Sequence, residues 1–364
     1  MNKEIREITG MRGYASVGVI IFHFFTISSV IRDLGFPPFV YAWNSGVDFF
    51  FVLSGFLLSI PFMSSSPKVD LRAFYVKRAF RIFPVYYLSI LVCGSVLLLS
   101  NYGTLQQLIA SLFFAQSFSP TTFNSINGVN WTLVIEEMFY VTLPIFSFFF
   151  MKKRWKISLP ACLLITIVYR LAVVHFYASD NVAFFLWQYP SYFGHFGIGI
   201  TLANFYSNKR IRKLHSSKLS SSTLAFLSVI SLLATQFVIG SIYSTDNNKQ
   251  AMPGIIFAFE YGALIYFVLV SPQTSRIRRI FDNRPAIFAG KISYSSYTWH
   301  LPIEIGLYQL GVPLLIWAPL SFALSLYVAS LSFRNLETPF LKLRNKFLAQ
   351  RGWGQVTNEI GSTT

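Results

Sequence analysis

The chain has 364 residues, of which 54% are hydrophobic and 12% are charged, whereas soluble domains average about 25% charged residues. This composition excludes an ordinary soluble domain and indicates an all-α, polytopic membrane protein. The net charge of +16 would suit nucleic acid, but its distribution along the chain favours membrane topology instead, so we expect no nucleic-acid partner. The two cysteines, Cys93 and Cys162, lie in apolar runs without disulfide or zinc spacing, and no metal site is expected.

Ten segments are long and apolar enough to cross roughly 30 Å of hydrocarbon as helices. In chain order they are residues 12–31, 44–62, 82–100, 131–151, 157–176, 184–206, 222–242, 253–270, 286–309 and 312–333. An eleventh stretch, 104–118, has Leu105, Leu108 and Leu112 at helical spacing with glutamines between them. That pattern predicts an amphipathic helix in the outer interface, not a further span.

The basic residues predict the orientation. With a cytoplasmic N-terminus, the outer loops hold only Arg32 and Lys249, and two more, Arg170 and Lys291, fall inside spans. The remaining 26 of the 30 basic residues then lie in inner segments, as the positive-inside rule requires. Both termini are therefore predicted to be cytoplasmic. We expect residues 1–340 to form the transmembrane domain and residues 341–364 to form a short basic cytoplasmic tail.

The first span carries two ionisable residues, Arg12 and His23. Eleven helical steps of about 100° return to nearly the same face after a rise of roughly 16 Å. The two side chains therefore share a stripe with Ser16 and Val19. An ionisable group at bilayer depth usually faces a cavity or a partner. The alternatives are a packed core histidine beside a positive-inside arginine, or a secretory signal peptide, against which the long apolar run and the missing A-x-A-like site both argue.

The next two spans add a carboxylate and a basic mouth. Asp48 lies near the outer end of the second span, either as a favourable charge at a helix start or as part of an outer half-site. Lys77, Arg78 and Arg81 precede the third span, and the two arginines share a helical face. They suit a cytosolic polyanion, or they mark topology and contact lipid head groups.

The fourth span opens with two adjacent carboxylates, Glu136 and Glu137, at a depth that is expensive without a role. Neighbouring helical residues point about 100° apart, so only one can face a given site well. Glu136 shares a polar stripe with Thr132 and Tyr140, and it is therefore the predicted functional carboxylate. Trp131 is placed like an interfacial anchor.

The ninth span contains His300, close to Pro302, which can open a helical turn and free a carbonyl. His300 is either a packed, hydrogen-bonded histidine or a member of the site. His175, His195, Arg170, Glu260 and Glu304 also lie in or near spans, and the sequence assigns them no role.

Taken together, six blocks of the chain resemble acyltransferase family 3, the integral membrane O-acyltransferases that act on bacterial surface glycans. The blocks are Arg12-x10-His23, GVDFFFVLSGFLLS, FYVKRAFRIFPVYY, WTLVIEEMFY, ISYSSYTWHLP and RNLETPF. Their order and spacing extend over essentially the whole chain. Two positions depart from the common pattern, Thr132 in place of serine and Thr338 in place of lysine.

The resemblance implies a multi-pass protein of the bacterial inner membrane that moves an acyl group, most often acetyl, from cytosolic acyl-coenzyme A to a sugar hydroxyl. The acceptor could be lipopolysaccharide, exopolysaccharide, a lipid-linked repeat or a small glycosylated metabolite, and a homo-oligomer is left open.

The expected catalytic residues are His23 as general base, Glu136 and Arg12. The donor is expected at Arg12, Lys77, Arg78 and Arg81. The acceptor is expected at Asp48, Trp131, Glu136, Tyr140 and His300. One rival interpretation is a transporter or flippase, although no internal repeat is evident. Another is a membrane glycosyltransferase that uses lipid-linked sugars, but its expected acidic residues in an early outer loop are reduced to Asp33 in loop 32–43.

Overall fold

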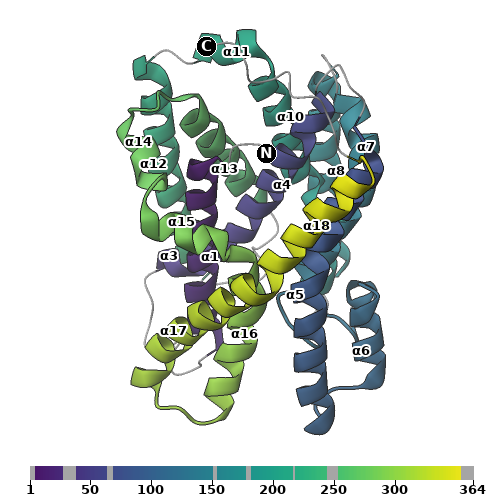
Figure 1. Ribbon diagram of the computed structural model, residues 1–364. Helices are drawn as coiled ribbons and strands as arrows, with labels where there is room; N and C mark the ends of the chain where they lie inside the picture. Colours follow the sequence, from purple (N-terminus) through teal and green to yellow (C-terminus); the bar gives the residue numbers. More distant parts are fainter. Residues whose placement is uncertain are drawn as a thin grey trace.

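The computed structural model describes residues 5–27, 38–63, 69–150, 154–177, 182–215, 218–243 and 253–353. Every regular element in these ranges is helical, which confirms the all-α prediction (Figure 1). The elements are α1 (Arg6–Ile27), α3 (Pro38–Tyr41), η1 (Ala42–Ser45), α4 (Gly46–Met63), α5 (Leu71–Leu99), α6 (Leu105–Leu112), η2 (Gln116–Phe118), α7 (Trp131–Phe150), α8 (Trp155–Phe176), α9 (Val182–Leu186), η3 (Tyr189–Tyr192), α10 (Phe193–Ser207), α11 (Lys209–His215), α12 (Lys218–Tyr243), α13 (Pro253–Val270), α14 (Arg276–Phe281), α15 (Arg284–Lys291), α16 (Ser293–Gln309), α17 (Leu314–Ser332), the π-helix η5 (Phe333–Glu337) and α18 (Thr338–Gln350).

Within the described ranges, eight helices are long and apolar enough to cross a membrane. They are Arg6–Ile27, Phe39–Met63, Leu71–Leu99, Trp131–Phe150, Trp155–Phe176, Ser221–Ser241, Pro253–Val270 and Leu314–Gln350. Each overlaps one of the ten predicted spans, although Leu71–Leu99 begins earlier than the predicted 82–100 and Leu314–Gln350 ends later than the predicted 312–333. The last of them continues through η5 into α18, so the first residues of the predicted tail 341–364 are part of a helix. Residues 354–364 of that tail lie outside the described residues.

The other two predicted spans are not continuous helices, and in that respect the prediction was wrong. Span 184–206 is divided among α9, η3 and α10, and Pro190 lies at the interruption. Proline lacks a backbone N–H and its ring collides with the carbonyl of the preceding turn. Span 286–309 is divided between α15 and α16 at Ile292, whose ψ of 2° leaves the helical range.

The predicted amphipathic helix is present as α6, beside the lower end of α5 in Figure 1. Thr104 and Gln107 form a reciprocal capping box at its start, with Thr104 N donating to Gln107 Oε1 at 2.9 Å. Leu108 and Leu112 pack against the core while Ile109 is exposed. With only eight residues, α6 is too short to cross the hydrocarbon layer.

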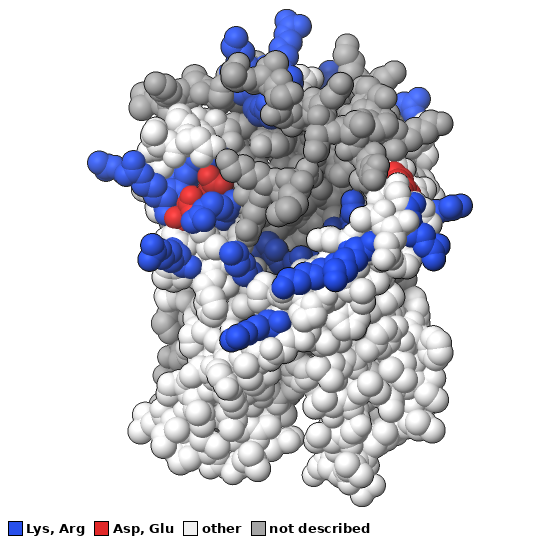
Figure 2. All heavy atoms as spheres, in the orientation of Figure 1, with Lys and Arg blue, Asp and Glu red and all other residues white. Residues whose placement is uncertain are grey.

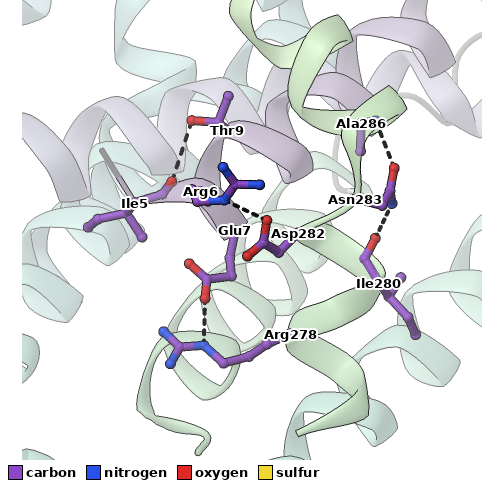
Figure 3. Close-up of polar contacts among 9 residues, drawn as sticks. All are labelled: Ile5, Arg6, Glu7, Thr9, Arg278, Ile280, Asp282, Asn283 and Ala286. Atoms are coloured by element: carbon purple, nitrogen blue, oxygen red, sulfur yellow. Dashed lines mark hydrogen bonds and ion pairs between the residues drawn. The ribbon is translucent and has the colours of Figure 1, made fainter. Parts of the chain in front are cut away.

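Helix α1 is fixed to α14 and α15 at its N-terminal end (Figure 3). Glu7 and Arg278 form a buried ion pair of 2.9 Å, and Arg6 binds Asp282 at 2.7 Å on the surface. The α1 and α15 backbones touch, since a Cβ atom on Gly290 would lie 1.7 Å from the carbonyl oxygen of Thr9. These contacts set the depth and rotation of α1 in the bundle.

The Lys and Arg side chains visible in Figure 2 lie in the upper and middle parts of the molecule. The lower end, where Figure 1 shows α6 and the connection from α16 to α17, is white in that view. Both of these lower segments belong to loops predicted to face outward. The separation of basic and uncharged ends agrees with the pattern that the positive-inside rule describes.

The contact between α1 and α15 gives a stability prediction. Gly290→Ala should lower the thermal unfolding midpoint of the detergent-solubilised protein, because overpacking a close contact costs roughly 1–3 kcal/mol. Gly306→Ala in α16 is the matched control, since a Cβ atom there meets nothing within 4 Å. Equal midpoints for the two variants would show that α1 and α15 are not held at backbone contact.

The predicted orientation can be tested on two exposed residues, Thr121 after α6 and Lys209 in α11. A cysteine at position 121 should react with an impermeant thiol reagent in intact cells. A cysteine at position 209 should react only after permeabilisation. The native Cys93 and Cys162 are buried and give a low background. The reverse labelling pattern would contradict the orientation inferred from the basic residues.

Candidate active site

A cavity of about 290 Å³ lies among α1, α4, α5, α7 and α16. Its polar lining comes from all five helices and consists of Arg12, Ser54, Arg78, Arg81, Thr132, Glu136, Tyr140, Ser293, Tyr294 and Tyr297. The rest of the wall is apolar and comes mainly from α4. An apolar cavity with a few convergent polar groups is the usual form of a small-molecule site.

Glu136 is the carboxylate of this cavity. Ser54 Oγ donates a hydrogen bond to its Oε1, and Tyr140 Oη donates to its Oε2 at 3.0 Å. The predicted stripe of Thr132, Glu136 and Tyr140 faces the cavity as a unit. Glu137 does not line the cavity, and its Oε1 is buried without a hydrogen-bond partner among the described residues.

Three of the four predicted donor-binding cations line the same cavity. Arg12 Nη2 donates to Ser293 Oγ at 2.8 Å, and the guanidinium of Arg78 lies 5.9 Å from the centre of the Tyr140 ring. Arg78 Nε is buried and has no hydrogen-bond partner within the described part of the chain. Arg81 follows one helical turn later. Lys77, the fourth cation, is half-buried outside the cavity lining.

His23 does not line the cavity but is paired with His300 of α16 beside it. His300 Nε2 lies 3.2 Å from His23 Nδ1, and the two ring centres are 4.9 Å apart. The ring of Tyr297, which does line the cavity, is 5.8 Å from the ring of His300. Since Arg12 and His23 both contact α16, the predicted shared face of α1 is the face turned toward α16.

The backbone partners of the two histidines define their tautomers. His23 Nδ1 lies 2.9 Å from the Val19 carbonyl oxygen, and His300 Nδ1 lies 3.0 Å from that of Ser296. A carbonyl oxygen only accepts, so each neutral ring carries its proton on Nδ1. His300 Nε2 is then an acceptor for the Nδ1–H of His23. The Nε2 of His23 has no hydrogen-bond partner among the described residues, so its lone pair is available, as a general base requires.

Two predicted acceptor residues lie away from the cavity. Asp48 Oδ1 is 2.8 Å from Nε2 of the fully buried His195, so this carboxylate connects α4 to α10. It does not line the cavity that contains Glu136. Trp131 stacks on Trp187 with ring centres 4.9 Å apart, which is a packing contact. The sequence could not show either pairing, because the partners are more than 50 residues away.

The remaining polar residues also lie outside this site. His175 is exposed on α8 beside Phe176, and Glu260 accepts hydrogen bonds from Ser231 and Thr235. Glu304 is fully buried, and neither of its carboxylate oxygens has a hydrogen-bond partner among the described residues. None of these side chains lines the cavity.

Two residues in or beside the site were not predicted from the sequence. Ser54 was not among the predicted site residues, yet it lines the cavity and donates a hydrogen bond to Glu136. Glu337, in the block RNLETPF, is almost fully buried, accepts from Ser295 Oγ at 3.2 Å and lies within electrostatic reach of Arg81 and Arg12. The sequence feature that could have identified Glu337 is the presence of a carboxylate within one of the six blocks that resemble the family.

Comparison with known proteins identifies relatives over nearly the whole chain. The model of a family described as an acyltransferase domain matches residues 5–334. The O-acetyltransferase OatA of Staphylococcus aureus strain NCTC 8325 is 24% identical over 367 residues, which cover 92% of this chain and 57% of that protein. No solved structure matches.

Two further relatives are named for a substrate. The putative peptidoglycan O-acetyltransferase YrhL of Bacillus subtilis strain 168 is 26% identical over 93% of this chain and 55% of its own length. The peptidoglycan O-acetyltransferase OatA of Listeria monocytogenes is 27% identical over 93% of this chain and 56% of its own length. The chain thus spans somewhat more than half the length of the curated relatives it matches.

The contacts of Glu136 predict which of the two neighbouring carboxylates matters. Glu136→Gln should lower turnover by about two orders of magnitude or more, as expected for an acid–base or orienting group. In glutamine, an NH₂ donor replaces one of the two acceptor oxygens. The side chain can then no longer accept from Ser54 and Tyr140 through separate oxygens. Glu137→Gln is the matched control and should keep most activity. Turnover is measured on membranes with equal protein levels, and a more damaging change at 137 would mean that α7 is rotated by about 100°.

Proposed function

This chain belongs to the acyltransferase-domain family, and from that membership we propose that it transfers an acetyl group from cytosolic acetyl-coenzyme A to a glycan hydroxyl. The reaction would take place in the bacterial cytoplasmic membrane. One observation carries the proposal: a single cavity joins three arginines to a hydrogen-bonded carboxylate, with a histidine pair directly beside it. The relatives' names supply the acetyl group and the class of acceptor.

The donor is proposed to enter past the arginines. Coenzyme A is a polyanion at one end and an acyl thioester at the other, and guanidinium groups bind phosphate through charge-assisted hydrogen bonds. Arg12, Arg78 and Arg81 converge on the cavity from α1 and α5. The apolar wall supplied by α4 suits the uncharged arm that carries the thioester.

Two of the relatives are named for peptidoglycan, so a peptidoglycan glycan or its precursor is the first acceptor to test. Glu136, with Ser54 and Tyr140, presents one carboxylate and two hydroxyls to the cavity. We assign this trio the role of orienting a sugar hydroxyl. A sugar hydroxyl can donate to such a carboxylate, whose ionised form offers both oxygens as acceptors.

His23 is the proposed general base. Its Nε2 removes the proton of the acceptor hydroxyl as that oxygen attacks the thioester carbonyl carbon. The C–O bond of the ester forms and the C–S bond breaks. The proton then passes from His23 to the departing sulfur, so coenzyme A leaves as the free thiol. The Nδ1–H of His23 would be shared between the Val19 carbonyl oxygen and Nε2 of His300, and both acceptors would keep this tautomer, as a third group orients the base in other nucleophilic sites.

The function is tested by incubating the purified protein with acetyl-coenzyme A. Release of free coenzyme A thiol should depend on a glycan acceptor, and mass spectrometry should find the acceptor heavier by one acetyl group. A transporter or flippase would move its solute without releasing thiol. Absence of acceptor-dependent release across peptidoglycan, lipid-linked and lipopolysaccharide acceptors would refute the proposal.

The histidine pair yields a separate prediction. His23→Ala should abolish measurable transfer, because general-base catalysis contributes about 10²–10⁴-fold to the rate. His300→Ala should reduce transfer, because His23 would lose one of the two groups that orient it. His175→Ala, an exposed histidine on α8, is the control and should leave turnover unchanged. Thiol release by equal amounts of folded protein is the measurement. Near-normal turnover of His23→Ala would exclude His23 as the base.

A further inference from the structure

Helix α18 follows the residues that match the family and crosses over α5 (Figure 1). Its aromatic side holds it there, because Phe340 and Phe347 both pack on Phe80 of α5 with ring centres 6.4 and 6.0 Å apart. In the sequence of α5, Phe80 lies between Arg78 and Arg81, the two arginines that this helix contributes to the cavity. The contact therefore places α18 at the basic mouth of the proposed donor site.

Arg344 is the residue of α18 that joins this mouth. It lies within electrostatic reach of Lys77, Arg78 and Arg81, and it is half-buried, whereas Lys342 and Lys346 on the same helix are exposed. Within the described part of the chain, its hydrogen bonds go to the neutral side-chain amide of Asn345. Figure 2 shows Lys and Arg side chains aligned over α18, along the lower border of a hollow.

Four cations thus gather without a direct ion pair among the described residues, although Asp70, Glu136 and Glu337 lie within electrostatic reach of Lys77, Arg78 and Arg81 respectively. Within the described part of the chain, none of Lys77, Arg78, Arg81 and Arg344 forms an ion pair with a carboxylate within 4 Å. Like charges that are partly removed from water repel one another, and the arrangement is stabilised when an anion binds between them. The cluster therefore has the form of a site for a ligand with several phosphates.

We propose that Arg344, together with Lys77, binds the 3′-phosphate of acyl-coenzyme A. The assignment rests on the proposed function and follows from the order of groups along the donor. The thioester must reach Glu136, and Arg78 and Arg81 line the cavity and suit the diphosphate. Arg344 and Lys77 lie outside the cavity lining, where the donor's far end, with the ribose 3′-phosphate, would emerge.

The test compares acetyl-coenzyme A with acetyl-3′-dephospho-coenzyme A on the purified full chain in phosphatidylcholine nanodiscs. The unaltered protein should bind the complete donor more tightly. Arg344→Gln should weaken binding of the complete donor about tenfold, the size of a hydrogen bond to a charged group, and should hardly change binding of the dephospho form. Lys77→Ala is a second variant with the same expected loss of discrimination. Lys346→Ala is the matched control and should discriminate normally.

The outcomes separate this inference from the function on which it rests. If the unaltered protein binds neither donor, the acyl-coenzyme A proposal itself is refuted, and the inference with it. In a second case, the unaltered protein binds the complete donor more tightly than the dephospho form. If the Arg344 and Lys77 variants then keep the same preference for the complete donor, only the inference is overturned. A second set of nanodiscs contains phosphatidylglycerol. A binding defect of Arg344→Gln that appears only there would assign the cluster to a lipid head group, and this would also overturn the inference.

Discussion

The backbone contact of α1 with α15, together with the buried ion pair of Glu7 and Arg278, is the constraint on which the site depends. Removing one partner of a buried ion pair commonly costs about 3–5 kcal/mol, because the other charge is left without compensation. With its N-terminal turn fixed in this way, α1 can present only one face to α16. Arg12 and His23 lie on that face, and each contacts α16 at a different level.

Polar groups at this depth are stabilised by meeting one another across helices. Ser54 and Tyr140 satisfy both oxygens of Glu136, and Thr132 donates to the hydroxyl of Tyr297 at 2.9 Å. A carboxylate held by two hydroxyl donors in an apolar wall keeps a fixed orientation. It is thereby preorganised for a ligand, which reduces the ordering that binding would otherwise require.

Interruptions in two regular helices bring further polar side chains to the cavity or its surroundings. The break at Ile292 separates α15, which holds α1, from α16, which carries Ser293, Tyr297 and His300. The π-helix η5 ends at Glu337, which it directs toward Ser295 and the arginines. π-Helical turns are uncommon and are often found at functional sites. Here the turn lies where a straight helix would pass from α17 into α18.

Local sequence determined the features that repeat along a single helix. The spacing of Thr132, Glu136 and Tyr140 showed that they share a face, and the spacing of Arg78 and Arg81 did the same for α5. Helical periodicity of 3.6 residues is a property of a short segment, so it can be read without the fold. The capping residues of α6 and the apolar lengths of eight spans belong to the same class.

Only the tertiary structure decided which faces meet. Asp48 was expected near the acceptor but pairs with His195, and His23 meets His300 across 277 positions of sequence. The break of span 286–309 and the position of Arg344 beside α5 likewise follow from packing against α1 and Phe80. Periodicity fixes the direction of a side chain about its own helix axis. The partner it reaches depends on the rotation and depth of another helix, and these are set by contacts between residues far apart in the chain.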